Sequence, residues 1–127
     1  MVRRVNRIGR SQAARADRHA LYELAVQNVD ELCRFIDLQF LLLRGRRPLG
    51  FCEDFCGTAQ AACQFLRLGR RRRAIGIDID QRVLDWARRH HLAALGRRQR
   101  QRIRLIRGDV RRVAVEPVDV VGAFNFS

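Results

Sequence analysis

Apolar and polar positions alternate at helical spacing through the first third of the chain. Across residues 19–44, apolar side chains recur three and four residues apart, which predicts helix. The pattern has a joint near residue 30, so we expect Asp30 to be the N-cap of a second helix that runs to about Leu43. Gly45 and Pro48 then end the helix, because glycine favours the left-handed C-cap and proline cannot continue the helix.

The rest of the chain alternates short apolar runs with amphipathic segments. The predicted strands cover residues 48–55, 74–79, 103–107 and 118–124, and the predicted helices cover residues 58–68 and 81–95. Residues 70–73 are predicted to be a solvated loop, and residues 96–102 a basic connector. Asp80 is well placed to cap the second of these helices, which Gly96 ends.

This order predicts an α/β fold with a Rossmann-like, doubly wound and mainly parallel sheet. Run 74–79 is almost entirely apolar, as in a strand covered on both faces, whereas run 103–107 alternates and suits a sheet edge. We therefore divide the chain into a basic flexible arm (1–18), a helical segment (19–47) and the α/β domain (48–127). In such sheets, ligands bind beyond the carboxyl ends of the strands.

The most informative stretch follows the first predicted strand and reads Glu-Asp-Phe-Cys-Gly-Thr-Ala, residues 53–59. It is a strand-to-helix turn, and Gly57 has no side chain to hold a ligand away from the backbone. Asp78 ends the second strand 21 residues after Gly57, where an acid can accept hydrogen bonds from a ribose diol. Asp109 ends the third strand and suits either an amino group of a ligand or a Gly-Asp turn.

Charge adds a second hypothesis. All 26 basic residues are Arg, and the formal net charge is +13. Such a surface attracts polyanions, so a non-catalytic nucleic-acid-binding module is an alternative function, based on the arm and on loops 70–73 and 97–102. A compositional preference for Arg at solvated positions explains the same data, because the Arg residues are spread along the chain.

Cysteine spacing and hydropathy indicate the cellular compartment and argue against a metal site and a membrane span. The four Cys residues lack the paired spacing of a zinc site, so we expect free, buried thiols in a reducing, cytoplasmic compartment and no metal. No apolar run reaches the length of a membrane span, so no membrane partner is expected. Trp86 is predicted to pack on the sheet, and His90-His91 to be a helix-surface pair.

The ordered motifs resemble the N-terminal, cofactor-binding part of a class I, Rossmann-like S-adenosylmethionine-dependent methyltransferase. They are the 53–59 turn, Gly-Ile-Asp-Ile-Asp at 76–80, Arg-Gly-Asp-Val at 107–110 and Ala-Phe-Asn-Phe-Ser at 123–127. The first and last are most similar to a bacterial branch of that superfamily. The resemblance covers about residues 19–127 and implies S-adenosylmethionine as the cofactor and an unknown small-molecule or nucleic-acid methyl acceptor.

The resemblance also implies roles for individual residues. Glu53 would lie near the methionine amino group, and Asp78 would bind the ribose hydroxyls. The turn around the cofactor would be formed by Cys56, Gly57, Thr58 and Ala59. The adenine would be contacted by Ile79, Asp109 and Val110, and the methyl sulfonium and acceptor would be faced by Phe124 and Asn125. Asn125 is the candidate residue on the acceptor side.

The chain departs from the family pattern at the first turn. Most relatives have three glycines there, whereas this chain has Phe55 and Ala59 at the outer two positions. A nicotinamide-dependent dehydrogenase fragment would share the sheet and the ribose acid, but the Gly-x-Gly-x-x-Gly spacing of that class is missing.

The sequence stops after the fourth predicted strand, and the family's sheet has about seven, so the fourth strand would keep an unpaired edge. We therefore expect a fragment of a longer protein or a truncated gene product, with marginal stability alone. Thermal unfolding of the 127-residue chain, followed by circular dichroism, measures this. A cooperative transition in a monomeric sample would contradict the expectation.

Overall fold

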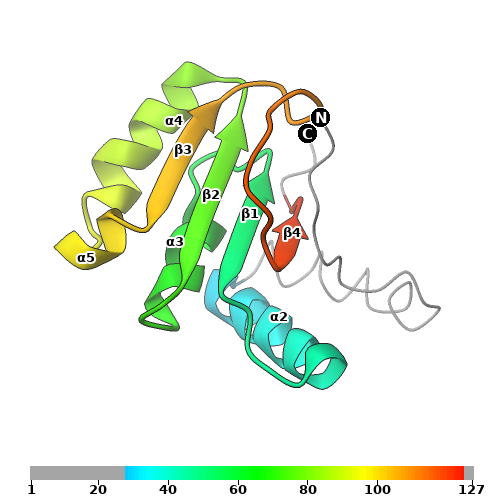
Figure 1. Cartoon of the computed structure of the whole chain (residues 1–127). Helices are drawn as coiled ribbons and strands as arrows, with labels where there is room; N and C mark the ends of the chain where they lie inside the picture. Colours follow the sequence, from blue (N-terminus) through cyan, green and yellow to red (C-terminus); the bar gives the residue numbers. More distant parts are fainter. Residues whose placement is uncertain (1–27, 125–127) are drawn as a thin grey trace.

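The computed structural model describes residues 28–124, which contain a four-stranded, fully parallel sheet (Figure 1). The strand order is β3-β2-β1-β4, so β3 and β4 lie at the two edges. The strands are β1 (Gly50–Asp54), β2 (Arg73–Asp78), β3 (Ile103–Arg107) and β4 (Val120–Gly122). This confirms the predicted α/β fold, with β4 shorter than the predicted run 118–124. The predicted arm and the first part of the helical segment lie outside the described residues.

The helices are α2 (Val29–Arg44), α3 (Gln60–Arg67), α4 (Gln81–Ala87) and α5 (Arg97–Arg100). The side chain of Asn28 caps α2 by accepting from the backbone N–H groups of Asp30 and Glu31, so the predicted cap at Asp30 is wrong by two residues. Asp30 instead supplies negative charge to the first turn, where it is also favourable. Gly45 is the left-handed C-cap that the sequence predicted.

The helix predicted for residues 81–95 changes its geometry along its length. Asp80 caps α4 as expected, and η1 (Arg88–Leu92), a π-helical turn, follows directly. The predicted basic connector contains the short helix α5. Among the described residues, no helix has both the length and the hydropathy required to cross a membrane.

Helices α2, α3 and α4 share one hydrophobic core with one face of the sheet. Leu32 and Ile36 of α2, Phe65 of α3 and Leu84 of α4 pack in the same cluster as Phe51 of β1. The rings of Phe51 and Phe65 lie 5.2 Å apart. This packing fixes the helices above the sheet and orients the turn that joins β1 to α3.

The opposite face of the sheet is covered in a different way. Cys52, Ile75 and Ile77 are buried there, and the chain between β3 and β4 packs against them through valines that include Val113 and Val118. No helix of the described residues covers this face. β2 is thus covered on both faces, as its apolar run predicted, but only one cover is helical.

A buried ion pair links α2 to the start of β2. The Arg72 guanidinium donates two hydrogen bonds of 2.7 Å to the two carboxylate oxygens of Asp37, and it also lies 4.5 Å from the centre of the Phe65 ring. Only 3% of the Arg72 side chain and 8% of the Asp37 side chain are exposed. The predicted solvated loop 70–73 is therefore wrong at Arg72, and Arg73 already belongs to β2.

Removing one partner of this pair leaves an uncompensated buried charge, so Asp37→Ala should lower the free energy of unfolding by about 3–5 kcal/mol. Asp85→Ala is the matched control, because it breaks the exposed pair with Arg88 and should cost less than about 1 kcal/mol. Urea unfolding of both variants measures the difference. Equal losses of unfolding free energy in the two variants would show that the buried pair contributes no more than the exposed one.

Candidate functional site

A cavity of about 570 Å³ lies at the carboxyl ends of β1 and β2. Six of the residues that the sequence predicted for cofactor binding line it: Glu53, Cys56, Gly57, Thr58, Asp78 and Phe124. They come from the end of β1, the following turn, the end of β2 and the residue pair after β4. The parallel sheet brings these segments together because the carboxyl ends of its strands share one edge.

The turn after β1 is held in left-handed backbone conformations at three positions. The φ angles of Phe55, Gly57 and Ala59 are 53°, 55° and 60°. Phe55 and Ala59 occupy the two positions where the family pattern has glycine, so the chain keeps the glycine conformation without the glycine residues. Left-handed backbone costs an L-residue roughly 1–2 kcal/mol, so the turn stores strain that its hydrogen bonds must hold.

Those hydrogen bonds tie the turn to β2 and to itself. The N–H of Cys56 donates to the Ile77 carbonyl at 2.9 Å, and the N–H of Ala59 donates to the Cys56 carbonyl at 2.8 Å. The Phe55 ring stays 48% exposed, so the turn accommodates this large residue by directing its side chain to solvent. Ala59 is fully buried and is the N-cap of α3.

Asp78 connects the end of β2 to the same turn. One of its carboxylate oxygens accepts from the N–H of Gly57 at 2.9 Å, and the other accepts from the N–H of Asp80 at 3.0 Å. The spacing from Gly57 predicted that Asp78 would be a binding residue, but it did not predict the hydrogen bond between the Gly57 N–H and the Asp78 carboxylate. Each carboxylate oxygen has two lone pairs, so Asp78 keeps acceptor capacity for hydroxyl groups in the cavity.

Glu53 is a buried acid in the cavity wall. Its side chain belongs to a residue that is only 5% exposed, and one oxygen accepts from the N–H of Ala62 in α3 at 3.1 Å. Burial raises the pKa of Glu53 to about 8, the Ala62 N–H opposes this rise, and the charge of Asp78 adds to it. Glu53 therefore carries a proton at neutral pH when no cation is beside it.

Cys56 has a packing role. Its sulfur lies so close to Gly76 that a Cβ at position 76 would come within 2.9 Å of it, so the thiol fills the space that the glycine leaves. Burial raises the pKa of Cys56 far above its ordinary value, which suppresses the reactive thiolate. All four cysteines are buried and none forms a disulfide, as predicted.

Four predicted residues do not line the cavity: Ala59, Ile79, Asp109 and Val110. Ile79 directly follows β2 and is 67% exposed. Asp109 is engaged by Arg111, which donates from its backbone N–H and its guanidinium, and this contact lowers the pKa of Asp109 to about 2. Val110 packs with the apolar cluster on the second face of the sheet. Asn125 lies outside the described residues.

The cavity also contains residues that the sequence did not single out for it. Val29 and Leu32 of α2 line it beside Asp80 and Val83 of the α4 region. Helical periodicity predicted a helix here, but it could not tell which partner the first turn of α2 would face. The cavity wall thus depends on how α2 packs.

His91 is a second residue whose contact was not predicted. Its Nδ1 lies 2.7 Å from the carbonyl oxygen of Thr58, so η1 contacts the turn after β1. Trp86 is 41% exposed and packs on His90 and His91, with ring centres 4.1 and 5.1 Å apart, not on the sheet as predicted. His91 is therefore part of the support for the turn.

Comparison with known proteins supports the fold assignment through structure only. No family model and no curated protein sequence matches the chain. Among solved structures, the plantazolicin methyltransferase BpumL in complex with SAH superposes with a TM-score of 0.60 at 13% identity over 87% of this chain. The glycopeptide N-methyltransferase MtfA gives 0.54 at 23% identity over 69%. The methyltransferase domain of bacterial CtHen1-CN gives 0.55 at 16% identity over 80%.

These similarities show that the sheet and its helices have the Rossmann-like fold of methyltransferases. The chain spans 39% of the BpumL chain, 35% of the MtfA chain and 50% of the CtHen1-CN chain. MtfA has also been crystallised in complex with S-adenosyl-L-homocysteine and with S-adenosyl-L-methionine. Below 25% identity, the likeness concerns the fold and not the substrate.

The buried Glu53 makes stability depend on pH in a defined direction. Its pKa is about 8 in the folded chain and 4.5 in the unfolded chain, so the folded chain binds more protons between these values and loses stability as pH rises through them. Glu53→Gln cannot ionise and should become more stable than the wild type by up to a few kcal/mol at pH 8, with a smaller difference near pH 5. Urea unfolding at both pH values measures this, and a difference that does not grow with pH would contradict it.

Proposed function

We propose that this chain is the S-adenosylmethionine-binding portion of a methyltransferase. The observation that carries the proposal is the bond between Gly57 and Asp78 at the wall of the carboxyl-end cavity. It places a ligand-accessible glycine turn beside an acid with free acceptor capacity, at the edge of the sheet where α/β proteins bind nucleosides. The cofactors named for the MtfA and BpumL structures support the choice of ligand.

In this proposal, the predicted site residues meet different parts of the cofactor. The turn of Cys56, Gly57, Thr58 and Ala59 surrounds the methionine portion, and Asp78 accepts from the ribose hydroxyls. Three residues outside the cavity wall would complete the adenine site: Ile79 offers an exposed apolar side chain, and Asp109 and Val110 would meet the adenine edge. These roles come from the resemblance of the motifs, and the present geometry of Asp109 requires its contact with Arg111 to loosen or to share the carboxylate.

Glu53 would bind the amino group of the methionine portion. An ammonium group beside a buried carboxyl favours the charged form, so binding would lower the pKa of Glu53 and release a proton. The neutral acid in the free chain avoids an uncompensated charge in the core. The cavity is thus suited to a ligand that carries a positively charged group.

The bound cofactor would supply an already activated methyl group, so the chain's task is to position it and to exclude water. Phe124 lines the cavity and packs its ring against Phe51, with ring centres 6.3 Å apart, and it is the proposed neighbour of the methyl sulfonium. Asn125, the next residue, is the proposed contact on the acceptor side. The acceptors named for the neighbours differ from one another, so fold likeness does not select one.

The alternatives have less support. A dehydrogenase fragment would need the glycine spacing that the turn lacks.

The proposal includes a cytoplasmic location. Four buried thiols without a disulfide favour a reducing compartment.

Calorimetric titration with S-adenosylhomocysteine tests the proposal. Asp78→Ala should weaken binding about tenfold or more, because a hydrogen bond to a charged group contributes roughly 1.5–3 kcal/mol. Asp80→Ala removes the α4 cap in the same wall and should weaken binding much less.

Asp78→Asn is the second variant, because an amide keeps one acceptor oxygen for the Gly57 N–H while it loses the charge. Weakening by Asn as well as by Ala would point to the ligand contact and not only to a loosened turn. Equal effects of Asp78→Ala and Asp80→Ala, or no binding by the wild-type chain and by any longer protein that contains it, would overturn the proposal.

A further inference from the structure

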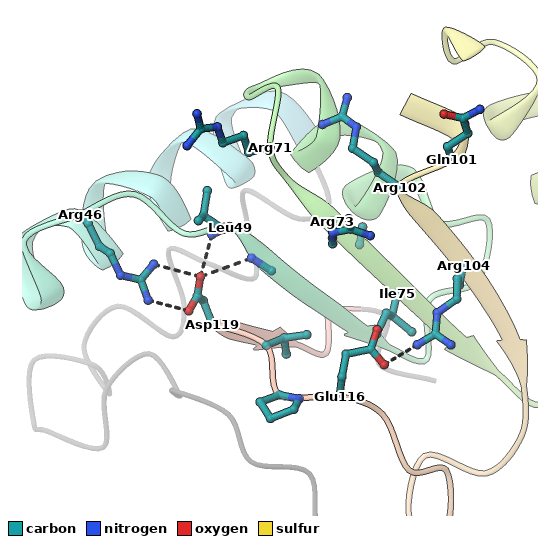
Figure 2. A pocket seen from close by; sticks show the side chains of 14 residues that line it. Arg46, Leu49, Arg71, Arg73, Ile75, Gln101, Arg102, Arg104, Glu116 and Asp119 are labelled. Atoms are coloured by element: carbon teal, nitrogen blue, oxygen red, sulfur yellow. Dashed lines mark hydrogen bonds and ion pairs between the residues drawn. The ribbon is translucent and has the colours of Figure 1, made fainter. Parts of the chain in front are cut away.

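A second cavity, of about 460 Å³, lies at the amino-terminal end of the sheet, opposite the candidate cofactor site (Figure 2). Its floor is formed by small or apolar residues of the strands, among them Gly50, Ala74 and Ile75. Its walls carry five guanidinium groups and two carboxylates. The arginines come from the segment after α2, the turn before β2, β2 itself, and the start of β3: Arg46, Arg71, Arg73, Arg102 and Arg104.

Both carboxylates of this cavity are already used by two of the arginines. Asp119 accepts two hydrogen bonds from Arg46, at 2.8 and 3.1 Å, and one from the N–H of Leu49 at 2.7 Å. Glu116 pairs with Arg104. These bonds, drawn as dashed lines in Figure 2, fix the rim of the cavity and neutralise only two of its five cations.

The other three arginines have no carboxylate partner within residues 28–124. The side chains of Arg71 and Arg73 are exposed and make no hydrogen bond or ion pair there. Arg102 donates from Nε and Nη1 to backbone carbonyls, including those of Gly69 and Arg72, so its position is fixed while its charge is not compensated. Like charges gathered over an apolar floor repel one another, and a bound anion relieves that repulsion.

The chemistry of the cavity selects phosphate and disfavours base recognition. Guanidinium groups bind phosphate oxygens in a bidentate manner. Among residues 28–124, no aromatic side chain lines the cavity, so this part of the chain offers no surface for base stacking there. The basic surface continues beside it, since Arg98 and Arg100 of α5 lie close to Arg102 in the sequence and are both exposed. Cations spread over such a surface can contact several phosphates of one polyanion.

We propose that Arg71, Arg73 and Arg102 form a binding site for the phosphate backbone of a nucleic acid. The site is separate from the cofactor cavity, because the two lie at opposite ends of the same parallel strands. A nucleic acid bound at these arginines would leave the carboxyl-end cavity open. The proposal does not depend on the methyltransferase assignment.

The test is fluorescence anisotropy with a labelled oligouridylate of about 20 nucleotides, titrated with the full chain between about 50 and 200 mM salt. The double variant Arg71→Ala/Arg73→Ala should bind about tenfold more weakly at the low-salt end. The slope of log affinity against log salt should fall by about 1.4, since each phosphate contact on a single strand contributes roughly 0.7. Arg71→Lys/Arg73→Lys keeps the charges and should retain most of the binding.

The matched control is Arg89→Ala/Arg112→Ala, which removes the same charge from exposed positions outside the cavity. An equal loss in both double variants would overturn the proposal, because it would show that only net charge matters. Full displacement of the oligonucleotide by uridine monophosphate or inorganic phosphate at matched ionic strength would also overturn it, in favour of a small phosphate ligand. Titration of Arg71→Ala/Arg73→Ala with S-adenosylhomocysteine should match the wild type, which separates this site from the cofactor site.

Discussion

The hydrogen bond between the Gly57 N–H and the Asp78 carboxylate is the contact on which the candidate site depends. It joins the turn after β1 to the end of β2, and the bond from Cys56 to Ile77 reinforces it. Together they hold Phe55 and Ala59 in left-handed conformations that neither residue favours. The same acid that would recognise a ribose also maintains the shape of the turn, so recognition and local stability share one side chain.

Buried charge is handled in two different ways on the two sides of α3. Near β2, Asp37 and Arg72 neutralise each other through two short hydrogen bonds. At the cavity, Glu53 has no basic partner among the described residues, and burial raises its pKa instead. The first arrangement is complete without a ligand, whereas at neutral pH the second favours the charged carboxylate only when a cation lies beside it. This contrast distinguishes a residue that serves the fold from one that is available for binding.

The parallel sheet places an acidic cavity at one end and an arginine-rich cavity at the other. Its carboxyl end gathers Glu53, Asp78 and the glycine turn, and its amino end gathers the arginines of the second cavity. Spread along the sequence, the arginines gave no indication of a face. Pairing of β1 with β2 and β4, and of β2 with β3, brings residues 46, 71–73, 102 and 104 together. Compositional preference for Arg can explain their number but not this arrangement.

Periodicity, glycine and the strand-end acids are local signals, so the order of the strands, the parallel α/β class and half of the cavity-lining residues could be predicted from the sequence. Six predicted site residues line one cavity for that reason. The burial of Arg72, the exposure of Trp86 and the contact of His91 with Thr58 were decided by tertiary packing. Each depends on a partner more than 30 residues away or on the face a helix turns inward, which no local pattern records. The amino-end arginine cluster has the same origin.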